Sequence, residues 1–289
     1  MPATILDSRF VAAQKRDELI PHIEAFKARS GLAPSLVIVT VGDDPATYDY
    51  IRIASAQARR VGIRAVAHVL SDRLSREEVV EHIEALNADP KVHAIALQTP
   101  LPAHLNLGEV SSTIHPDKDV EGYHPANAGS VRRGSPRLIP PPAQGALQLL
   151  DAYGINPSGM QAVVVGRNAI IGKPLATLLM EVDATVMIAH RGTPNVTGLI
   201  AHADLLVLGA ALPDGIPTSA LKPGVVILDF GINYVADGED DKILGNVVFE
   251  EAVRIAGAIT PMPGGTGPMT TISLLQNTLK AAQLQANRA

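Results

Sequence analysis

Apolar runs alternate with amphipathic stretches along the whole chain. The short runs that predict buried strands lie at 35–41, 64–70, 93–98, 161–165, 185–189, 205–208, 225–229 and 258–260. Stretches with helical periodicity lie at 46–61, 75–87, 144–153 and 269–285, and Ser75 with Glu78 has the spacing of a capping box. Strands that alternate with helices are typical of mostly parallel sheets, so we predict an α/β fold.

A stretch rich in Pro, Asp, His and Gly interrupts this alternation at residues 99–142, where the sequence predicts irregular structure. Such long loops are usually functional, and this one follows a buried strand, where α/β folds place ligands. A chain of 289 residues is long enough for two domains. We predict a catalytic domain of residues 1–139 plus 269–289, a Rossmann-like domain of residues 140–268, and a ligand-binding cleft between them.

Composition excludes several classes of function. A net charge of -5 and an aromatic content of 3% argue against nucleic acid as a partner. No apolar run approaches the roughly 20 residues of a membrane span, so we expect no membrane partner. The chain has no cysteine, which excludes disulfides and thiolate ligands, and we predict no metal site. The first ten residues do not resemble a signal peptide, so we expect a cytoplasmic protein.

The segment 162–179 places a strand, a glycine turn and a helix start in succession. Gly166 would allow a tight turn, Gly172 a close backbone approach, and the amides that open the helix could hold a pyrophosphate. Only two glycines of the usual dinucleotide motif are present, so a plain strand-to-helix turn remains an alternative. Arg191 follows the next strand, where an acid would favour NAD. An arginine there suits a 2'-phosphate and favours NADP, although it could also be a solvated loop cation.

Several separated motifs together resemble one known family. They are the segments 41–46 leading to Tyr50, 98–102, 115–122, 166–167, 229–233 and 261–270. Their order and spacing resemble those of the bifunctional methylenetetrahydrofolate dehydrogenase/methenyltetrahydrofolate cyclohydrolase family over essentially the whole chain. The resemblance implies NADP-dependent oxidation of 5,10-methylenetetrahydrofolate to 5,10-methenyltetrahydrofolate, with a reduced folate bound by the N-terminal domain. It also implies a homodimer.

The resemblance also implies roles for individual residues. Tyr50 would pack against the pterin or its aryl tail, Gln98 would face the reacting centre, and Glu121 would accept hydrogen bonds from the ring nitrogens. These three are the predicted catalytic residues. The other predicted substrate-binding residues are Pro100, Leu101, Pro263, Gly264 and Gly265. The predicted NADP-binding residues are Gly166, Arg167, Asn168, Gly172, Arg191 and Ile232.

The sequence departs from the family at positions that would line the site. A lysine one helical turn after the tyrosine is associated with the cyclohydrolase step, and Ala54 stands there. Glu121 replaces the usual aspartate. We therefore hypothesise that hydride transfer survives while cyclohydrolase activity is weak or absent. Two alternatives remain: a noncatalytic folate- and dinucleotide-binding paralogue, and a Rossmann dehydrogenase for an unrelated small acid.

Overall fold

The computed structural model describes residues 2–212, 215–231, 233–237 and 240–287, with the backbone alone described at 234–237 and 240–243. The chain forms two compact α/β units. Unit 1 comprises Met1–Ala12 and Pro142–Thr270, and unit 2 comprises Ala13–Pro141 and Thr271–Ala289. Residues 1–12, which the sequence had placed in the other domain, lie in unit 1 because strand β1 pairs with strand β11 of that unit.

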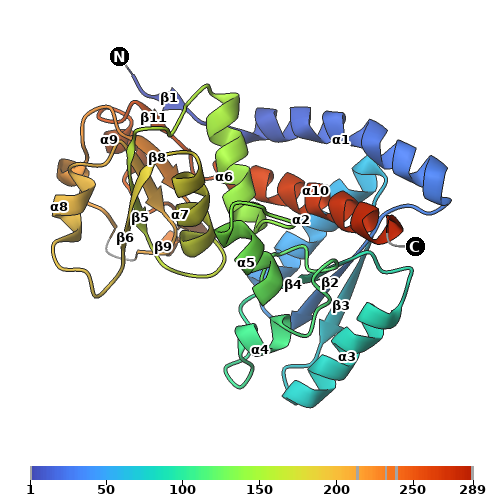
Figure 1. The fold of residues 1–289 in the computed structure, drawn as a ribbon. Coiled ribbons are helices and arrows are strands. Elements are labelled where there is room, and N and C mark those ends of the chain that lie inside the picture. The colour runs from blue at the N-terminus through green and yellow to red at the C-terminus, as the bar shows by residue number, and fades with distance from the viewer. Residues whose placement is uncertain (1, 213–214, 232, 238–239, 288–289) are drawn as a thin grey trace. The chain divides into compact units, whose positions relative to one another are not determined.

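Unit 1 is built on a six-stranded parallel sheet of order β1-β11-β8-β7-β5-β6 (Figure 1). In that order its strands are Thr4–Ile5, Ala258–Ile259, Val226–Asp229, Leu205–Leu208, Gln161–Val165 and Thr185–Ala189. The central strands β5 and β7 are almost entirely buried, which explains why they are unbroken apolar runs in the sequence. The predicted bounds of β5, β6 and β7 match the structure, and those of β8 and β11 differ by one residue.

Helices surround this sheet and close its core. They are α6 (Pro141–Ala152), α7 (Gly172–Glu181), α8 (Val196–Ile200), α9 (Phe249–Ala252) and the 3-10 turn η1 (Thr218–Ala220). A separate antiparallel pair is formed by β9 (Asn233–Asp237) and β10 (Asp240–Leu244). The core gathers buried side chains such as Val163, Leu206 and Ile227 from neighbouring strands. α7 packs against β5 and β6, so it begins beside the carboxyl ends of these strands.

Unit 2 contains a three-stranded parallel sheet of order β3-β2-β4. The strands are β2 (Ser35–Val41), β3 (Arg64–Leu70) and β4 (Ala94–Leu97). The helices are α1 (Ser8–Ser30, of which residues 8–12 belong to unit 1), α2 (Pro45–Val61), α3 (Arg76–Ala88), α4 (Leu107–Ser111), α5 (Pro125–Arg132) and α10 (Gly267–Ala286, of which 267–270 belong to unit 1). The bounds of β2 and β3 match the sequence prediction, and the capping box at Ser75 is present.

The prediction of irregular structure at 99–142 is wrong in part, because α4 and α5 lie within this stretch. Local caps explain both helices. Asn106 Oδ1 accepts from the backbone N–H of Glu109 at 3.2 Å, and His124 Nδ1 accepts from that of Ala126 at 3.0 Å. At five and eight residues, the two helices are too short to show a clear apolar period in the sequence.

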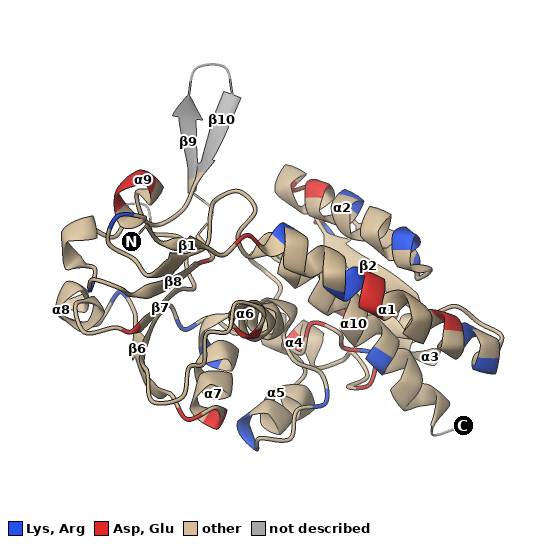
Figure 2. Ribbon diagram, turned by 90° about the horizontal axis from the view of Figure 1, so that it is seen from above, with Lys and Arg blue, Asp and Glu red and all other residues tan. Residues whose placement is uncertain are grey.

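Charged residues of both signs are mixed along the surface helices α1 and α2 (Figure 2). Within the described residues, none of the helices combines the length and apolarity needed to cross a membrane.

Candidate active site

Gln98 and Glu121 meet at the carboxyl end of β4. Gln98 follows the last residue of that strand, and its backbone N–H donates to Val39 O at 2.8 Å, which continues the pairing with β2. Its side-chain Nε2 donates to Glu121 Oε1 at 3.3 Å. Both side chains are buried, with exposed fractions of 9% and 6%. The structure thus brings two of the three predicted catalytic residues into direct contact.

The segment before Glu121 is fixed by buried polar contacts. Lys118 directs its ammonium at three carbonyls at the end of α3, Leu86 O at 3.1 Å and Asn87 O and Asp89 O at 2.8 Å. These oxygens have no partners within the helix, so the lysine satisfies them. Burial lowers the pKa of Lys118. The lysine of this motif therefore stabilises the fold and does not contact Glu121.

Asp119 anchors the same segment from its other side. Its carboxylate accepts from the backbone N–H groups of Tyr123 and His124 at 3.2 and 2.8 Å, and from Asn127 Nδ2 at 2.9 Å. Burial raises the pKa of Asp119 while these donors lower it. The 115–122 motif is thus largely structural, and the hydrogen bonds around it hold Glu121 in place.

Within the described residues, no cation forms an ion pair with Glu121. Burial and the charge of Asp119 raise the pKa of Glu121 to about 8, against a smaller opposing effect of the Gln98 hydrogen bond. The pKa of half-buried Tyr50, on α2, is raised by burial and by Glu121. Ala54, one turn further along α2, is fully buried. Tyr50 is thus close enough to Glu121 for their charges to interact. Among the described residues, no hydrogen bond joins the two side chains.

Tyr123 belongs to this cluster although the sequence did not identify it. The pKa of its phenol is raised by burial and by the nearby Glu121, Tyr50 and Asp119. Gly122 turns the chain between Glu121 and Tyr123 with φ +70°, and a Cβ there would lie 2.8 Å from Pro140 Cδ. Gly122 ends the 115–122 motif and allows the next side chain to turn back toward Glu121. This glycine was the feature of the sequence that could have identified Tyr123.

The other predicted substrate residues of unit 2 follow Gln98 directly. The Thr99–Pro100 peptide bond is cis, and Pro100 is exposed. Leu101 is half-buried and packs against the apolar core of unit 2. Pro100 therefore presents its ring at the surface beside Gln98, while Leu101 also contributes to packing.

In unit 1, two glycines shape the turn between β5 and α7. Gly166 has φ +123°, and a Cβ there would lie 3.1 Å from the backbone carbon of Gly209. A Cβ at Gly172 would lie 2.3 Å from Gly166 O, a distance that no side chain tolerates. The turn is therefore more closely packed than an ordinary strand-to-helix connection, and both positions require glycine.

Asn168 organises the loop that leads into α7. Its Oδ1 accepts from the N–H groups of Ile170, Ile171 and Gly172 at 3.2, 2.8 and 3.2 Å, and its Nδ2 donates to Gly209 O at 2.6 Å. Ile170 and Ile171 precede α7, so Asn168 binds one amide of the helix itself, that of Gly172. A pyrophosphate at the start of α7 stays a prediction. This side chain shapes the loop from within.

The two predicted cofactor arginines are exposed. Arg167 lies in the loop after β5, and Arg191 follows β6 in a turn where His190 N–H donates to Thr193 Oγ1 at 3.0 Å. In the described part of the chain, neither guanidinium forms an ion pair. Both are therefore available to a phosphorylated ligand. Ile232, the remaining predicted cofactor residue, lies outside the described residues.

The predicted substrate-binding residues Pro263, Gly264 and Gly265 belong to unit 1. The Met262–Pro263 bond is cis and Pro263 is exposed. Gly264 has φ +98°, and its carbonyl accepts from Ser8 N and Ser8 Oγ, both at 3.2 Å. A Cβ at Gly265 would lie 2.4 Å from Pro261 O. The segment is thus a tight turn whose shape depends on glycine, with one proline ring on the surface.

Comparison with known proteins identifies the family. The model of the tetrahydrofolate dehydrogenase/cyclohydrolase catalytic domain matches residues 6–121, and that of the NAD(P)-binding domain of the same family matches residues 140–286. The chain belongs to the tetrahydrofolate dehydrogenase/cyclohydrolase family. It is 42% identical over 283 residues to the bifunctional protein FolD of Chloroflexus aggregans, with 98% of each chain covered.

Solved structures of this family share the fold of the whole chain. The bifunctional enzyme FolD from Campylobacter jejuni is 35% identical, with a TM-score of 0.92 over 99% of this chain and 100% of that one. The Trypanosoma brucei enzyme, complexed with NADP cofactor and inhibitor, is 31% identical, with a TM-score of 0.95 over 100% of both chains. Family membership thus accounts for both units, and the two-domain α/β prediction is confirmed.

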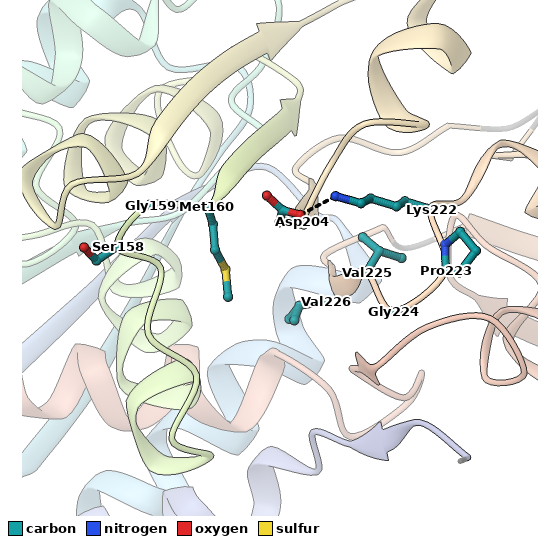
Figure 3. A pocket seen from close by; sticks show the side chains of 9 residues that line it. All are labelled: Ser158, Gly159, Met160, Asp204, Lys222, Pro223, Gly224, Val225 and Val226. Carbon is teal, nitrogen blue, oxygen red and sulfur yellow. Dashed lines mark hydrogen bonds and ion pairs between the residues drawn. The ribbon is translucent and has the colours of Figure 1, made fainter.

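Unit 1 also contains a pocket (Figure 3). It has a volume of about 420 Å³ and is lined by Ser158, Gly159, Met160, Asp204, Lys222, Pro223, Gly224, Val225 and Val226. Asp204 Oδ1 accepts from Lys222 Nζ at 2.5 Å, and its Oδ2 accepts from the Gln161 N–H at 2.9 Å. Because β5, β7 and β8 are parallel, these residues mark the amino edge of the sheet, away from the candidate dinucleotide loop.

Metal chemistry has no evident ligand set in this member of the family. Across the residues that the structure describes, no three His, Cys, Asp or Glu side chains are grouped closely enough to hold an ion.

Proposed function

We propose that this chain catalyses the NADP-dependent oxidation of 5,10-methylenetetrahydrofolate to 5,10-methenyltetrahydrofolate. The observation that carries the proposal is the match of both domains to the tetrahydrofolate dehydrogenase/cyclohydrolase family. The buried Gln98–Glu121 pair and the glycine turn at 166–172 supply polar groups and backbone shape consistent with that activity.

Unit 2 would bind the folate. The Glu121 carboxyl can accept hydrogen bonds from the pterin amino and ring nitrogens, and these bonds are strongest when the carboxyl is ionised. Tyr50 can pack its ring against the pterin or aryl group, and Pro100 and Leu101 stay sequence-based candidates for substrate binding. Pro263, Gly264 and Gly265 of unit 1 stay sequence-based candidates for substrate binding. Glu121 and Tyr50 of unit 2 would bind and orient the substrate.

Unit 1 would bind the dinucleotide, and its residues fit NADP. Gly166 and Gly172 leave the β5–α7 turn without side chains where a diphosphate approaches backbone in such folds. Asn168 holds the turn, and the exposed Arg167 and Arg191 can contact phosphate oxygens, including a 2'-phosphate. Ile232 stays a sequence-based candidate. NADP supplies the nicotinamide that accepts the hydride, and the chain supplies alignment and exclusion of water.

The turnover test uses the full chain with 5,10-methylenetetrahydrofolate and either NADP or NAD. We expect reduced dinucleotide to form in the presence of the folate, with NADP as the more efficient cofactor. The dehydrogenase proposal fails if neither cofactor is reduced while calorimetry shows that both ligands bind. That outcome would favour a noncatalytic binding protein.

We also propose that the cyclohydrolase activity is weak or absent. The motivating observation is that Ala54 offers no amine and that Lys118 is held by the carbonyls of α3. Proton transfer accompanies water attack on the methenyl carbon, and the amine that a lysine would supply for it at position 54 is missing. Adding the purified protein to methenyltetrahydrofolate should leave its decay close to the spontaneous rate. Hydrolysis well above that rate contradicts this proposal and leaves the dehydrogenase proposal intact.

We further propose a homodimer that pairs through β3. This strand hydrogen-bonds to β2 on one side only among the described residues, and it exposes Val66 and Val69 at 37% and 50%. Ile53 on the adjacent α2 is 46% exposed. An edge strand with unpaired backbone groups and exposed apolar side chains can pair with a second copy. Sedimentation should show a dimer that Val69→Lys dissociates, whereas Val248→Lys, on unit 1, should leave it unchanged.

The cytoplasm is the compartment that we propose. The fold contains no cysteine and so needs no oxidising environment. Cell fractionation tests this assignment, which fails if the protein is found in an exported fraction.

A further inference from the structure

The hydrogen bond between Gln98 and Glu121 determines which end of the Gln98 amide faces away from Glu121. Nε2 donates to Glu121 Oε1 at 3.3 Å. The nitrogen and oxygen of a carboxamide lie on opposite sides of the same carbon, so Oε1 of Gln98 is directed away from Glu121. No described residue donates a hydrogen bond to this oxygen. A buried amide thus has one end fixed by the protein and the other end available.

We propose that Glu121 is a positioning residue for Gln98, holding its amide so that the carbonyl oxygen faces the one-carbon unit of the folate. The inference rests on the proposed function, because that function places the reacting carbon beside Gln98. It extends that function by giving Glu121 a second role besides binding the pterin.

The chemistry explains why the orientation matters. Oxidation breaks one C–H bond of the methylene bridge, and the electron pair leaves with the hydrogen to the oxidised nicotinamide, which becomes NADPH. The carbon and its two neighbouring nitrogens then share a positive charge, and the folate loses no proton. A carbonyl oxygen directed at this carbon stabilises the developing charge. The NH₂ end of the same amide would oppose it.

The protonation of Glu121 controls this orientation. An ionised carboxylate can only accept hydrogen bonds, so it selects the NH₂ end of Gln98. A protonated carboxyl can instead donate to the Gln98 carbonyl, which turns the NH₂ end outward. Burial and Asp119 raise the pKa of Glu121 to about 8. The orientation that supports hydride removal is therefore favoured as the pH rises through this value.

Titratable and polar groups face Glu121 from its own segment, from α2 and from the end of β4. Asp119, on the same segment, is held by backbone N–H groups and Asn127. The phenols of Tyr50, on α2, and Tyr123 have pKa values raised above their ordinary value by burial and by Glu121, so both stay neutral. His124 uses Nδ1 as the cap of α5, and the Lys118 ammonium is held at the end of α3. The remaining contact, from the end of β4, is the Gln98 amide itself.

The first test observes Gln98 directly in the free, full-length protein. Glutamine side chains are labelled with nitrogen-15, and the Gln98 amide signal is assigned from its loss in Gln98→Leu. We expect this signal to shift in one step with a midpoint near pH 8, and to lose that step in Glu121→Gln. Glu84→Gln, the same change on an exposed position of α3, should keep it. The proposal is overturned if the wild-type Gln98 signal stays constant over about two pH units on either side of pH 8.

The second test measures kcat and kcat/KM for NADPH formation against pH. In the wild type kcat/KM, which reports the ionisation of the free enzyme, should rise through the same midpoint. Glu121→Gln, whose amide can hold Gln98 either way round, should lower kcat on the order of a hundredfold and flatten the profile, with the dissociation constant of NADP unchanged. Glu121→Asp should retain the pH dependence with a smaller loss. A Glu121→Gln enzyme with the wild-type kcat and profile also overturns the proposal.

The two tests separate this inference from the proposed function. If the wild type forms no NADPH at any pH, the dehydrogenase proposal fails, and with it the catalytic purpose of the orientation. The nitrogen-15 titration needs neither substrate nor turnover, so it still decides whether Glu121 positions Gln98.

Discussion

Asn168 Oδ1 accepts a hydrogen bond from the backbone N–H of Ile171 at 2.8 Å. The same oxygen receives the N–H groups of Ile170 and Gly172, both at 3.2 Å. One side chain thus binds two amides of the loop before α7 and the first amide of the helix. The loop is organised by its own asparagine before any dinucleotide binds, which leads to a first prediction.

Replacing Asn168 by alanine should loosen this loop. Because several amide contacts and the bond to Gly209 O are lost, the free energy of unfolding should fall by about 1–2 kcal/mol. The dissociation constant of NADP should rise about tenfold, which corresponds to a similar energy. Denaturant unfolding and calorimetry measure the two effects. Asn156→Ala, which loses one exposed bond to Ser158 N–H, should change stability by less than about 0.5 kcal/mol. Equal behaviour of the two variants would refute the anchoring role of Asn168.

Gly172 should tolerate no side chain. In Gly172→Ala the new Cβ would lie 2.3 Å from Gly166 O and 2.7 Å from Gly166 C, so the backbone of the turn must shift. We expect a loss of about 2 kcal/mol or more in stability and a large loss of NADP affinity. Gly129→Ala is the control, since a Cβ there meets nothing within 4 Å and alanine favours its helix α5. Wild-type NADP affinity in Gly172→Ala would show that the turn does not face the cofactor.

Arg191 should discriminate between the two dinucleotides. It is exposed, and no described residue forms an ion pair with it, so Arg191→Ala should leave the fold stable. The substitution should raise the dissociation constant of NADP about tenfold or more through loss of a charged hydrogen bond, and leave that of NAD unchanged. Fluorescence titration with both cofactors measures this. Arg254→Ala removes another exposed arginine of unit 1 and should affect neither cofactor. An equal loss for both cofactors in Arg191→Ala would argue against a 2'-phosphate contact.

Glu121 should make stability depend on pH. Its pKa in the folded protein, about 8, lies above the ordinary value of 4.5. Between these values the folded state holds a proton that the unfolded state releases, so the stabilising contribution of Glu121 declines as the pH rises from about 4.5 to about 8. Glu121→Gln removes this titration. Its stability relative to the wild type should therefore increase across that window by about 1 kcal/mol or more. Unfolding curves at several pH values test this, and a constant difference would contradict it.

Much of the fold could be predicted from the sequence because burial leaves a direct pattern. β5, β7 and β2 are buried on both faces and appear as unbroken apolar runs. Elements without such a pattern were missed. β1 has only two residues and is defined by its pairing with β11, a partner more than 250 residues away that periodicity cannot indicate. The short helices α4 and α5 depend on caps at Asn106 and His124.

The candidate site was predicted through motifs, and motifs do not separate binding from structural roles. Gln98 and Glu121 could be grouped from the sequence because both lie in motifs that resemble the family. The structure places their side chains in contact. The roles of Lys118 and Asn168 could not be read from their positions, since their partners are backbone atoms whose geometry exists only in the fold. Tyr123 was missed because its proximity to Glu121 depends on the turn at Gly122.

The measurement that tests the central claim most directly follows the transferred hydrogen. Methylenetetrahydrofolate is prepared with deuterium on the methylene carbon and incubated with the full-length protein and NADP. We predict that mass spectrometry finds deuterium in the nicotinamide ring of newly formed NADPH, in amounts equal to the methenyl product. Binding of both ligands without any deuterium in the dinucleotide would contradict the account.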